Sequence, residues 1–526
     1  MSGYLYRVPC GTSAPRPGRS AQKCGGWAIG AAGKCQWYQR RGIASSAARS
    51  RRDRRVNDRC LTQVTSEGLL ARQDRDSSIR KGRRGLLLSM QAARIAPSKA
   101  TLMEGTHFCY PAPQWYAQAL GVSCVESWVK ASRQPYWYRP AALAVLAPLD
   151  RQRGDDCART GAYDTVRAVQ LRREMLLFAR EHGVCAGVAE VYWSAGVTAL
   201  SEHALRAVHH AVTECFDVEA GAAFTASIAV SRLPHAETLA ALREFGVTTL
   251  HTCIDAKEPH PEEAIEPFMA AARNGGFRSI AVEVPIVAAD ASVRTARAWM
   301  DALLAYRPSR ILLSAGGNEQ AAGGQRSTAD SEARLQQVRQ ETFARLIAAG
   351  YEYIAHDAFA LRSDEWVGAK RIAALTPRPY GYATRMPYAS IAIGPGAIGN
   401  VGPMQYQNCR NADAYAEMLA REVLPVERGL LCTPDDLVRR TIMAGLLANF
   451  SVDIESIEEC YGIDFHMTFR RELAALEPLA RQGDVELDAK RLCLTPVGRF
   501  ACGRVADAFD RYLRQLEQAR REPEEP

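Results

Sequence analysis

A histidine and an aspartate stand side by side at the end of an apolar, strand-like run. Tyr351–His356 is followed directly by Asp357, and a carboxylate beside an imidazole can orient the ring or stabilise its charged form. In barrels of parallel strands, catalytic groups gather where the strands end. The sequence therefore makes His356 and Asp357 catalytic candidates, with a purely structural hydrogen bond as the alternative.

A second segment, Gly394–Gly402, holds four glycines in nine residues. Because glycine has no Cβ, such a segment allows the backbone to approach a ligand closely. The segment predicts one wall of a binding pocket.

The fifteen cysteines are scattered, with no Cys-x-x-Cys and no Cys-x-x-x-Cys pair. Zinc ribbons and local iron–sulfur sites need closely spaced thiolates, so this spacing argues against both. Scattered thiols in a long chain are typical of reduced core residues. We therefore predict a cytoplasmic protein.

The elements that must position these groups alternate between strand-like and helical runs. The strand-like runs are Ala141–Ala147, Gly187–Trp193, Ala223–Val230, Val247–Ile254, Ser279–Ile286, Arg310–Ser314 and Tyr351–His356. The helical patterns between them are Thr165–Glu181, Glu202–Cys215, Ala236–Phe245, Pro261–Asn274, Val293–Tyr306 and Glu332–Ala349. This alternation predicts βαβ units and a parallel sheet. Six or more such units predict an α/β fold with a (β/α) barrel, partial or closed.

The character of the sequence changes after Thr433, where helices are followed by a two-strand ribbon. Thr433-Pro434 is a helix start, with a capping hydroxyl and proline at the first helical position. Asp484–Leu494 alternates as a ribbon, and Thr495-Pro496 opens the last helix. This order predicts a C-terminal helical, winged-helix-like domain. Its acidic residues Glu455, Glu458 and Glu459 argue against DNA binding, because they would repel phosphates.

The basic excess of +8 belongs to the N-terminal tail, because residues 1–89 hold 16 Arg and 3 Lys against 5 acidic residues. We predict that this tail is disordered. The favoured interpretation is an upstream extension before a start at Met90 or Met103. A nucleic-acid arm and a transit peptide are the alternatives. No run of eighteen apolar residues occurs, so no membrane span is predicted. The predicted regions are 1–89 (tail), 90–140 (N-terminal segment), 141–360 (barrel), 361–432 (barrel-closing strands) and 433–526 (C-terminal domain).

Three separated motifs, in order, carry a family resemblance: Asp357-Ala358-Phe359-Ala360, Gly394-x-Gly396-x-Ile398 and Gln405-Tyr406-Gln407-Asn408. With them, the last third of the chain resembles oxygen-independent coproporphyrinogen III oxidase, a radical S-adenosylmethionine enzyme of haem biosynthesis. The resemblance implies a barrel of the radical SAM type. It places Gly394, Gly396, Ile398 and Gly196 on the cofactor side of the cavity, and Tyr382, Arg385, Gln407 and Asn408 on the substrate side.

The motif that would hold the iron–sulfur cluster does not match. The family carries Cys-x-x-x-Cys-x-x-Cys after the first barrel strand, and the resemblance aligns Asp150, Gly154 and Cys157 with it. One thiolate cannot hold a [4Fe–4S] cluster. The glycine-rich turn that the family places near the cofactor is reduced here to Gly196 alone. We therefore expect no metal, a vestigial Cys157, and no cofactor, although the family uses a [4Fe–4S] cluster and S-adenosyl-L-methionine.

Three hypotheses follow for function. The first is a catalytically inactive relative that binds a tetrapyrrole in haem metabolism. The second is an active oxidase whose cluster is held by distant cysteines such as Cys157, Cys185 and Cys253. The third is a regulatory or interaction module. We expect a monomer that binds neither nucleic acid nor membrane.

Overall fold

The computed structural model describes most of the chain after residue 106 and a few short pieces before it. The described residues are 27–29, 35–37, 103–104, 107–121, 125, 141–147, 157–182, 185–230, 235–254, 261–286, 290–315, 329–385 and 389–519. Within the predicted tail, β1 (Trp27–Ile29) and β2 (Cys35–Trp37) pair antiparallel, and the rest of it lies outside the described residues. No described helix is both long and apolar enough to cross a membrane.

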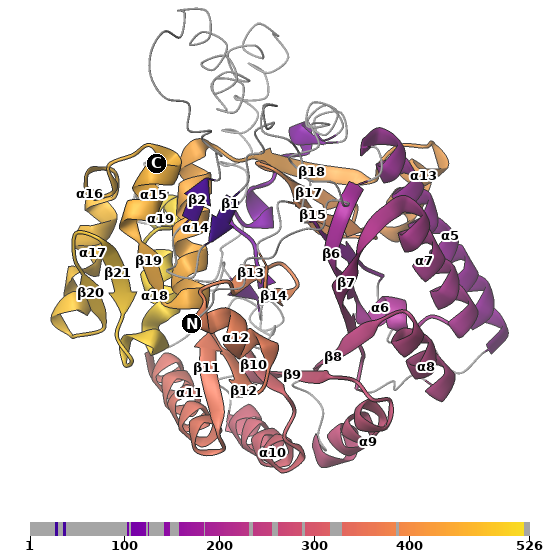
Figure 1. Ribbon diagram of the computed structural model, residues 1–526, viewed down its shortest axis with the longest axis horizontal. Coiled ribbons are helices and arrows are strands. Elements are labelled where there is room, and N and C mark those ends of the chain that lie inside the picture. Colours follow the sequence, from indigo (N-terminus) through magenta and orange to yellow (C-terminus); the bar gives the residue numbers. More distant parts are fainter. Residues whose placement is uncertain are drawn as a thin grey trace, which may run out of the picture.

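Parallel strands form the centre of one large, curved sheet (Figure 1). In chain order and side by side they are β5 (Ala141–Val145), β6 (Cys185–Trp193), β7 (Phe216–Ser227), β8 (Val247–Cys253), β9 (Ser279–Ile286) and β10 (Arg310–Ala315). The helices outside this curve are α5 (Cys157–His182), α7 (Glu202–Cys215), α8 (Ala236–Glu244), α9 (Pro261–Asn274), α10 (Asp290–Tyr306) and α11 (Ala329–Ala348). The short α6 (Ala195–Thr198) follows β6. The predicted βαβ alternation is confirmed.

Helix α7 shows why the helices lie on the sheet. Its buried residues recur every three or four positions and form one apolar face: Ala204, Leu205, Val208, Ala211, Val212 and Cys215. This face belongs to the same apolar core as the outward side chains of the strands. The predicted glycine caps are also present, since Gly246 and Gly350 each adopt a φ of 89° between a helix and the next strand.

The sheet does not continue as parallel units beyond β10. Strand β11 (Tyr351–Ala355) turns back at Asp357, whose φ is 52°, and β12 (Ala358–Leu361) inserts antiparallel between β10 and β11. The strand predicted at Tyr351–His356 therefore lies at the edge of the sheet, and it is not the next parallel barrel strand. The sheet ends at β11 on this side and stays open.

The other side of β5 is extended by strands from much later in the chain. They are β15 (Ala389–Ile393), parallel to β5, and then the antiparallel β16 (Ile398–Val401), β17 (Met404–Asn408) and β18 (Val426–Leu431). The resulting sheet has 12 strands, with β11 and β18 at its edges. The architecture is therefore a partial barrel.

A small sheet lies inside the curve, where Figure 1 shows β13 and β14. It consists of the hairpin β13 (Thr376–Arg378) and β14 (Gly381–Ala383), joined to β4 (His107–Phe108) and β3 (Met103–Glu104). Helix α12 (Glu365–Arg371) precedes the hairpin, and the Asp364 side chain caps it. The hairpin carries side chains from the second half of the chain toward the inner face of the strands.

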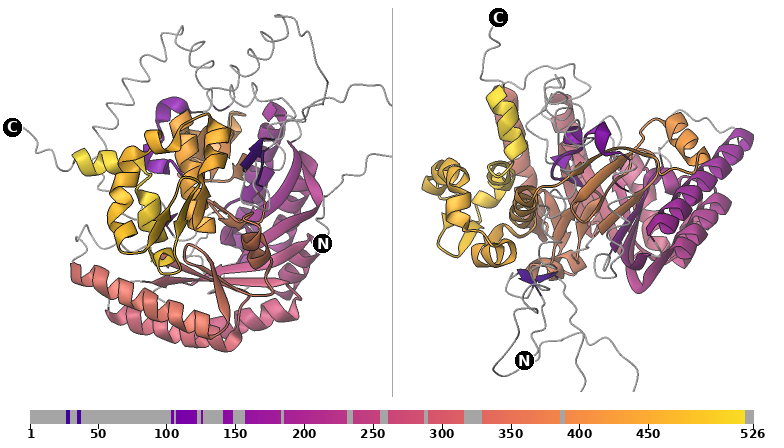
Figure 2. Two further views of the ribbon diagram at one scale, coloured as in Figure 1. Left: turned by 60° about the vertical axis from the view of Figure 1, so that its left-hand side comes forward. Right: turned by 90° about the horizontal axis from the view of Figure 1, so that it is seen from above.

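The C-terminal domain lies beside the barrel and has its own apolar core (Figure 2). Its helices are α14 (Pro434–Asn449), α15 (Ile454–Tyr461), α16 (Phe465–Thr468), α17 (Arg470–Arg481), α18 (Cys502–Asp507) and α19 (Arg511–Ala519). Its three-stranded sheet contains β19 (Ser451–Asp453), β20 (Val485–Leu487) and β21 (Arg491–Leu494). The predicted cap is confirmed, since Thr433 and Asp436 form a capping box at the start of α14. The predicted ribbon is β20–β21, and β19 adds a third strand to it.

Candidate functional site

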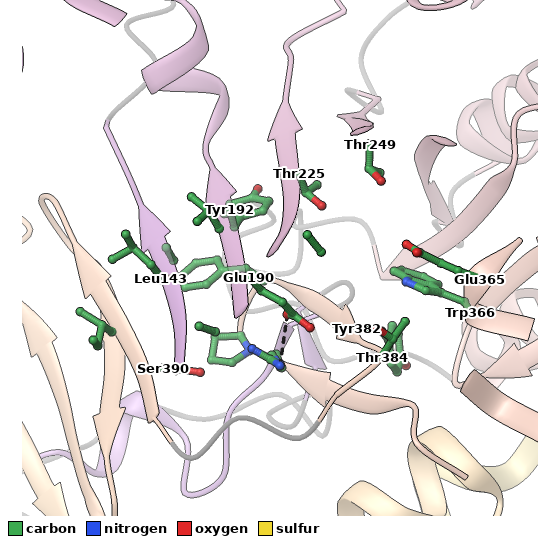
Figure 3. Close-up of a pocket in the computed structure, with 18 of the residues that line it drawn as sticks. Leu143, Glu190, Tyr192, Thr225, Thr249, Glu365, Trp366, Tyr382, Thr384 and Ser390 are labelled. Carbon is green, nitrogen blue, oxygen red and sulfur yellow. Dashed lines mark ion pairs between the residues drawn. The ribbon is translucent and has the colours of Figure 1, made fainter. Parts of the chain in front are cut away.

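A cavity lies against the inner face of the partial barrel (Figure 3). Its empty space, part of which is open solvent, is about 660 Å³. Strands β5 to β8 and β15, helix α12 and the β13–β14 hairpin line it. Prominent lining residues are Leu143, Glu190, Tyr192, Thr225, Thr249, Trp366, Arg378, Tyr380, Tyr382 and Ser390.

The alternation of a β-strand places the polar side chains of β6 in this cavity. Glu190 and Tyr192 are two residues apart, so they point to the same face, and Figure 3 shows both at the cavity. The following residue, Trp193, points the other way and packs against His209 of α7 and Phe245. The strand therefore has a polar inner face and an apolar outer face.

The partly buried Glu190 and the buried Arg378 form an ion pair at 3.1 Å. Burial raises the pKa of Glu190, and the opposite charge of Arg378 counteracts this. Burial likewise lowers the pKa of Arg378, against the effect of Glu190. Nη2 of Arg378 also donates to the carbonyl of Arg385 at 2.9 Å. Its Nε and Nη1 are buried and have no hydrogen-bond partner among the described residues.

Aromatic side chains supply flat walls. Tyr192 and Tyr380 stack with ring centroids 5.3 Å apart and an interplanar angle of 14°. Trp366 meets Tyr382 edge to face, and the Arg310 guanidinium lies 4.0 Å from the centre of the Trp366 ring. Hydrogen bonds fix two of the rings, because Tyr380 Oη accepts from the Ile398 amide and Tyr382 Oη donates to the His356 carbonyl. The cavity thus combines apolar faces with two buried cations, Arg310 and Arg378.

The glycine segment lies next to this cavity, and its glycines are not among the lining residues. A Cβ on Gly394 would lie 1.9 Å from the Leu146 carbonyl oxygen, and its φ is 112°. Gly396 has a φ of 71°, and its amide donates to the Cys409 carbonyl. Backbone packing against the end of β5 explains the glycine at 394.

Buried Glu174 of α5 holds this segment from the outer side of the sheet. It accepts hydrogen bonds from the Gly394 amide at 2.8 Å, from Asn408 Nδ2 at 2.6 Å and from Tyr415 Oη. Burial raises the pKa of Glu174 to about 7. Asn408, predicted on the substrate side, therefore belongs to a hydrogen-bond network that joins α5 to β15–β17.

The structure separates the other predicted substrate residues. Tyr382 lines the cavity, whereas Arg385 is exposed and pairs with Glu219 at 3.3 Å. Gln407 is buried in β17, where it accepts from Arg428 and donates to the Gly396 carbonyl. Of the four residues predicted on the substrate side, Tyr382 lies at the cavity, and for the other three this role stays a prediction.

The remaining predicted residues lie elsewhere. Gly196 is buried in α6. The Ile398 amide donates a hydrogen bond to the hydroxyl of Tyr380, which lines the cavity. His356 contacts Leu447 and Cys502 of the C-terminal domain, and Asp357 pairs with Arg339 of α11. Cys157 begins α5, its side chain is not among those described, and Asp150 and Gly154 lie outside the described residues.

Comparisons with known proteins match both parts of the chain. A family model described as the HemN C-terminal domain matches residues 432–501. Oxygen-independent coproporphyrinogen III oxidase of Pseudomonas aeruginosa is 30% identical over 301 residues, covering 54% of this chain and 65% of the relative. The protein of that name from Thermostichus vulcanus is 36% identical over 187 residues, covering 35% of this chain and 57% of the relative.

Residues 432–501 thus belong to the HemN C-terminal domain family, and a longer part of the chain is similar to oxygen-independent coproporphyrinogen III oxidases. The chain spans less than two thirds of the length of these curated relatives. A solved structure titled "Coproporphyrinogen III oxidase (HemN) from Escherichia coli is a Radical SAM enzyme" matches with a TM-score of 0.67 and 22% identity. The match covers 78% of this chain and 97% of that one, and it confirms the predicted radical-SAM type of fold.

This similarity corrects one expectation. The prediction of a chain without cofactors is wrong, because the relatives are oxygen-independent oxidases and the matched fold is that of a radical SAM enzyme. Such enzymes use a [4Fe–4S] cluster and S-adenosylmethionine. Among the described residues, no group of three His, Cys, Asp or Glu side chains is placed to hold a metal. We therefore assign no reaction step through the cluster.

Sequence reasoning missed the pairing of Glu190 with Arg378. A signal was present: Glu190 is a charged residue inside an otherwise apolar strand, two positions from Tyr192. Thr225 and Thr249 are similar polar interruptions of β7 and β8. Polar residues at matching heights on neighbouring parallel strands indicate a polar inner face. The partner, Arg378, could not be found this way because it comes from a distant hairpin.

Proposed function

We propose that this protein binds a carboxylate-bearing tetrapyrrole in the cavity inside the partial barrel. The observation that carries the proposal is Arg378, a cation that is 8% exposed and lines the cavity with two N–H groups unpartnered among the described residues. Buried polar groups are normally hydrogen-bonded. A ligand carboxylate supplies the acceptor that a guanidinium matches best.

Glu190 can release Arg378 when a ligand carboxylate binds. A ligand carboxylate beside Arg378 would compete with Glu190 for the same cation. Burial already raises the pKa of Glu190, so Glu190 can take up a proton when a second anion enters. Glu190 thus holds Arg378 in place in the empty cavity and can release it to a ligand.

The walls suit a flat macrocycle. The stacked Tyr192 and Tyr380 and the indole of Trp366 present aromatic faces around the same space. Aromatic rings favour offset stacking and edge-to-face contacts with other rings.

Binding of coproporphyrin III, followed by quenching of tryptophan fluorescence, tests the proposal. The informative variant is Glu190→Gln combined with Arg378→Met, because it removes the pair without leaving one buried charge unpaired. We expect it to weaken binding at least tenfold. Arg385→Gln is the matched control, since this arginine is nearby but exposed and paired with Glu219. Unchanged affinity in the double variant would overturn the proposal.

We further propose that the chain does not complete the oxidase reaction. The support is the donor set: of the three positions that the resemblance assigns to the cluster ligands, Asp150, Gly154 and Cys157, only the last is a cysteine. The test is anaerobic reconstitution with iron, sulfide and S-adenosylmethionine, followed by an assay with coproporphyrinogen III. Turnover lost in Cys185→Ser or Cys253→Ser would instead establish the active oxidase with distant ligands.

A further inference from the structure

A cysteine, a histidine and an aspartate meet where the barrel contacts the C-terminal domain. His356 and Asp357 form the turn between β11 and β12, and Cys502 is the first residue of α18. Cys502 Sγ lies 3.0 Å from His356 Nδ1, and His356 Nε2 lies 3.4 Å from Asp357 Oδ2. Both nitrogens of the imidazole are therefore engaged, one by sulfur and one by a carboxylate. This is the order of groups that activates a nucleophilic thiol.

The surroundings hold the imidazole in this position. The backbone N–H of His356 donates to the Leu447 carbonyl at 2.7 Å, and the His356 carbonyl accepts a hydrogen bond from Tyr382 Oη at 2.9 Å. Asp357 accepts a hydrogen bond from Arg339. Gly503 leaves room for the ring, since a Cβ there would lie 3.3 Å from His356 Cε1.

The charges that face the sulfur are mostly positive. Besides His356 the cations are Arg339 of α11 and Arg499, and the one carboxylate is Asp357. Lys370 of α12 shares the Phe450 ring with Arg499, and burial lowers the pKa of Lys370 to about 7. Burial lowers the pKa of His356, but Asp357 and Cys502 outweigh burial and raise it to about 9. Burial raises the pKa of Tyr353 and Tyr382, so both hydroxyls stay neutral. Nearby cations favour a thiolate over a thiol.

We propose that Cys502 is an activated thiol that a small hydroperoxide oxidises to a sulfenic acid. The sulfur attacks one peroxide oxygen, an S–O bond forms and the O–O bond breaks. Sulfur loses two electrons and the peroxide gains them. The departing alkoxide, or hydroxide in the case of hydrogen peroxide, takes the proton held by His356 and leaves as an alcohol or as water. The proposal is independent of tetrapyrrole binding, because it concerns a different part of the molecule.

The location gives this oxidation a structural effect. Cys502 is 0% exposed, whereas the His356 side chain is 17% exposed, so His356 links the buried sulfur to the solvent. An added oxygen would have to fit where Cys502 packs with Val505 and Ala506. Oxidation would therefore break the hydrogen bond to His356 and weaken the contact between the barrel and the C-terminal domain.

The test compares cysteines within the full chain. The protein is treated with hydrogen peroxide at pH 7, sulfenic acids are trapped with dimedone, and each cysteine peptide is quantified by mass spectrometry. Cys109 is the internal control: its sulfur contacts Tyr116 and Gln405 in place of a histidine, and burial raises its pKa to about 11. We expect Cys502 to be labelled at least tenfold faster than Cys109, although Cys109 is the less buried of the two. Equal or slower labelling of Cys502 would overturn the proposal.

One further measurement separates activation from simple access. His356→Asn should slow the labelling of Cys502 at least tenfold and leave that of the exposed Cys253 unchanged. An unchanged labelling rate of Cys502 in this variant would contradict the proposal. Should the variant fail to fold, the comparison of Cys502 with Cys109 in the unaltered protein still decides the matter.

Discussion

Two glutamates of this molecule, the buried Glu174 and the partly buried Glu190, differ in how completely they are paired. Glu174, outside the sheet, accepts three hydrogen bonds from three separate elements and has its acceptor sites filled by the protein. Glu190, inside the sheet, pairs with an arginine that keeps two N–H groups without a partner among the described residues. A filled network stabilises the architecture, whereas an incomplete one at a cavity leaves room for a ligand. The comparison assigns the first carboxylate to the fold and the second to binding.

The largest expected effect comes from breaking the filled network. Glu174→Ala would leave the Gly394 amide, the Asn408 amide and the Tyr415 hydroxyl without their acceptor, so we expect a loss of about 4 kcal/mol in unfolding free energy. Glu214→Ala is the control, because that glutamate forms an exposed pair with Arg172 and should cost less than about 1 kcal/mol. Chemical denaturation of both variants measures the difference. Similar losses would show that Glu174 does not anchor the sheet.

A smaller loss is expected within the glycine segment. Gly394→Ala would push a Cβ onto the Leu146 carbonyl at a positive φ, and should cost about 3 kcal/mol. Gly396→Ala also strains a positive φ but meets only the flexible Arg410 side chain at 3.5 Å, so about 1 kcal/mol is expected. Thermal unfolding of the two variants checks the order. A reversed order would mean that the segment is held from the cavity side.

The pH dependence of stability should also reveal Glu174. Its folded pKa of about 7 is above the ordinary value of 4.5, because burial disfavours the charged form. Its contribution to stability is therefore fully present below pH 4.5 and is lost as the pH rises through about 7. Between pH 5 and 8 we expect a loss of about 2 kcal/mol. Glu174→Gln should remove this slope, and a slope that persists in the variant would refute the assignment.

The alternation that builds the sheet could be predicted from the sequence. The strand at Ser279–Ile286 and the helices at Glu202–Cys215 and Pro261–Asn274 have the predicted bounds, because hydrophobic periodicity and capping are local properties. The return of the chain at Asp357 could not be predicted, since a left-handed conformation at a non-glycine residue depends on tertiary contacts.

The site was less predictable than the fold. The glycine at 394 was recognised as a position of close approach, but the partner is the carbonyl of Leu146 and not a ligand. The ion pair of Glu190 with Arg378 joins two segments far apart in the sequence, and no local pattern links them. The prediction of a cofactor-free chain failed for another reason: it rested on aligned cluster positions, whereas the family match extends over the fold.

The smallest stability effect should come from the cavity itself. Glu190→Gln with Arg378→Met replaces an ion pair by neutral groups of similar volume, which is often nearly neutral for stability. We expect a change within about 1 kcal/mol in unfolding free energy, in contrast to Glu174→Ala. A large loss of unfolding free energy would show that the ion pair of Glu190 with Arg378 stabilises the fold as Glu174 does, and the contrast between Glu174 and Glu190 would not hold.

The most direct test compares one macrocycle with and without its carboxylates. Coproporphyrin III and its tetramethyl ester are titrated in the same buffer into the unaltered protein and into the Glu190→Gln, Arg378→Met variant. Recognition of a carboxylate by Arg378 predicts that the unaltered protein prefers the free acid at least tenfold and that the variant shows no preference. Equal affinity of the unaltered protein for both compounds, or an unchanged preference in the variant, would contradict the assignment of this cavity.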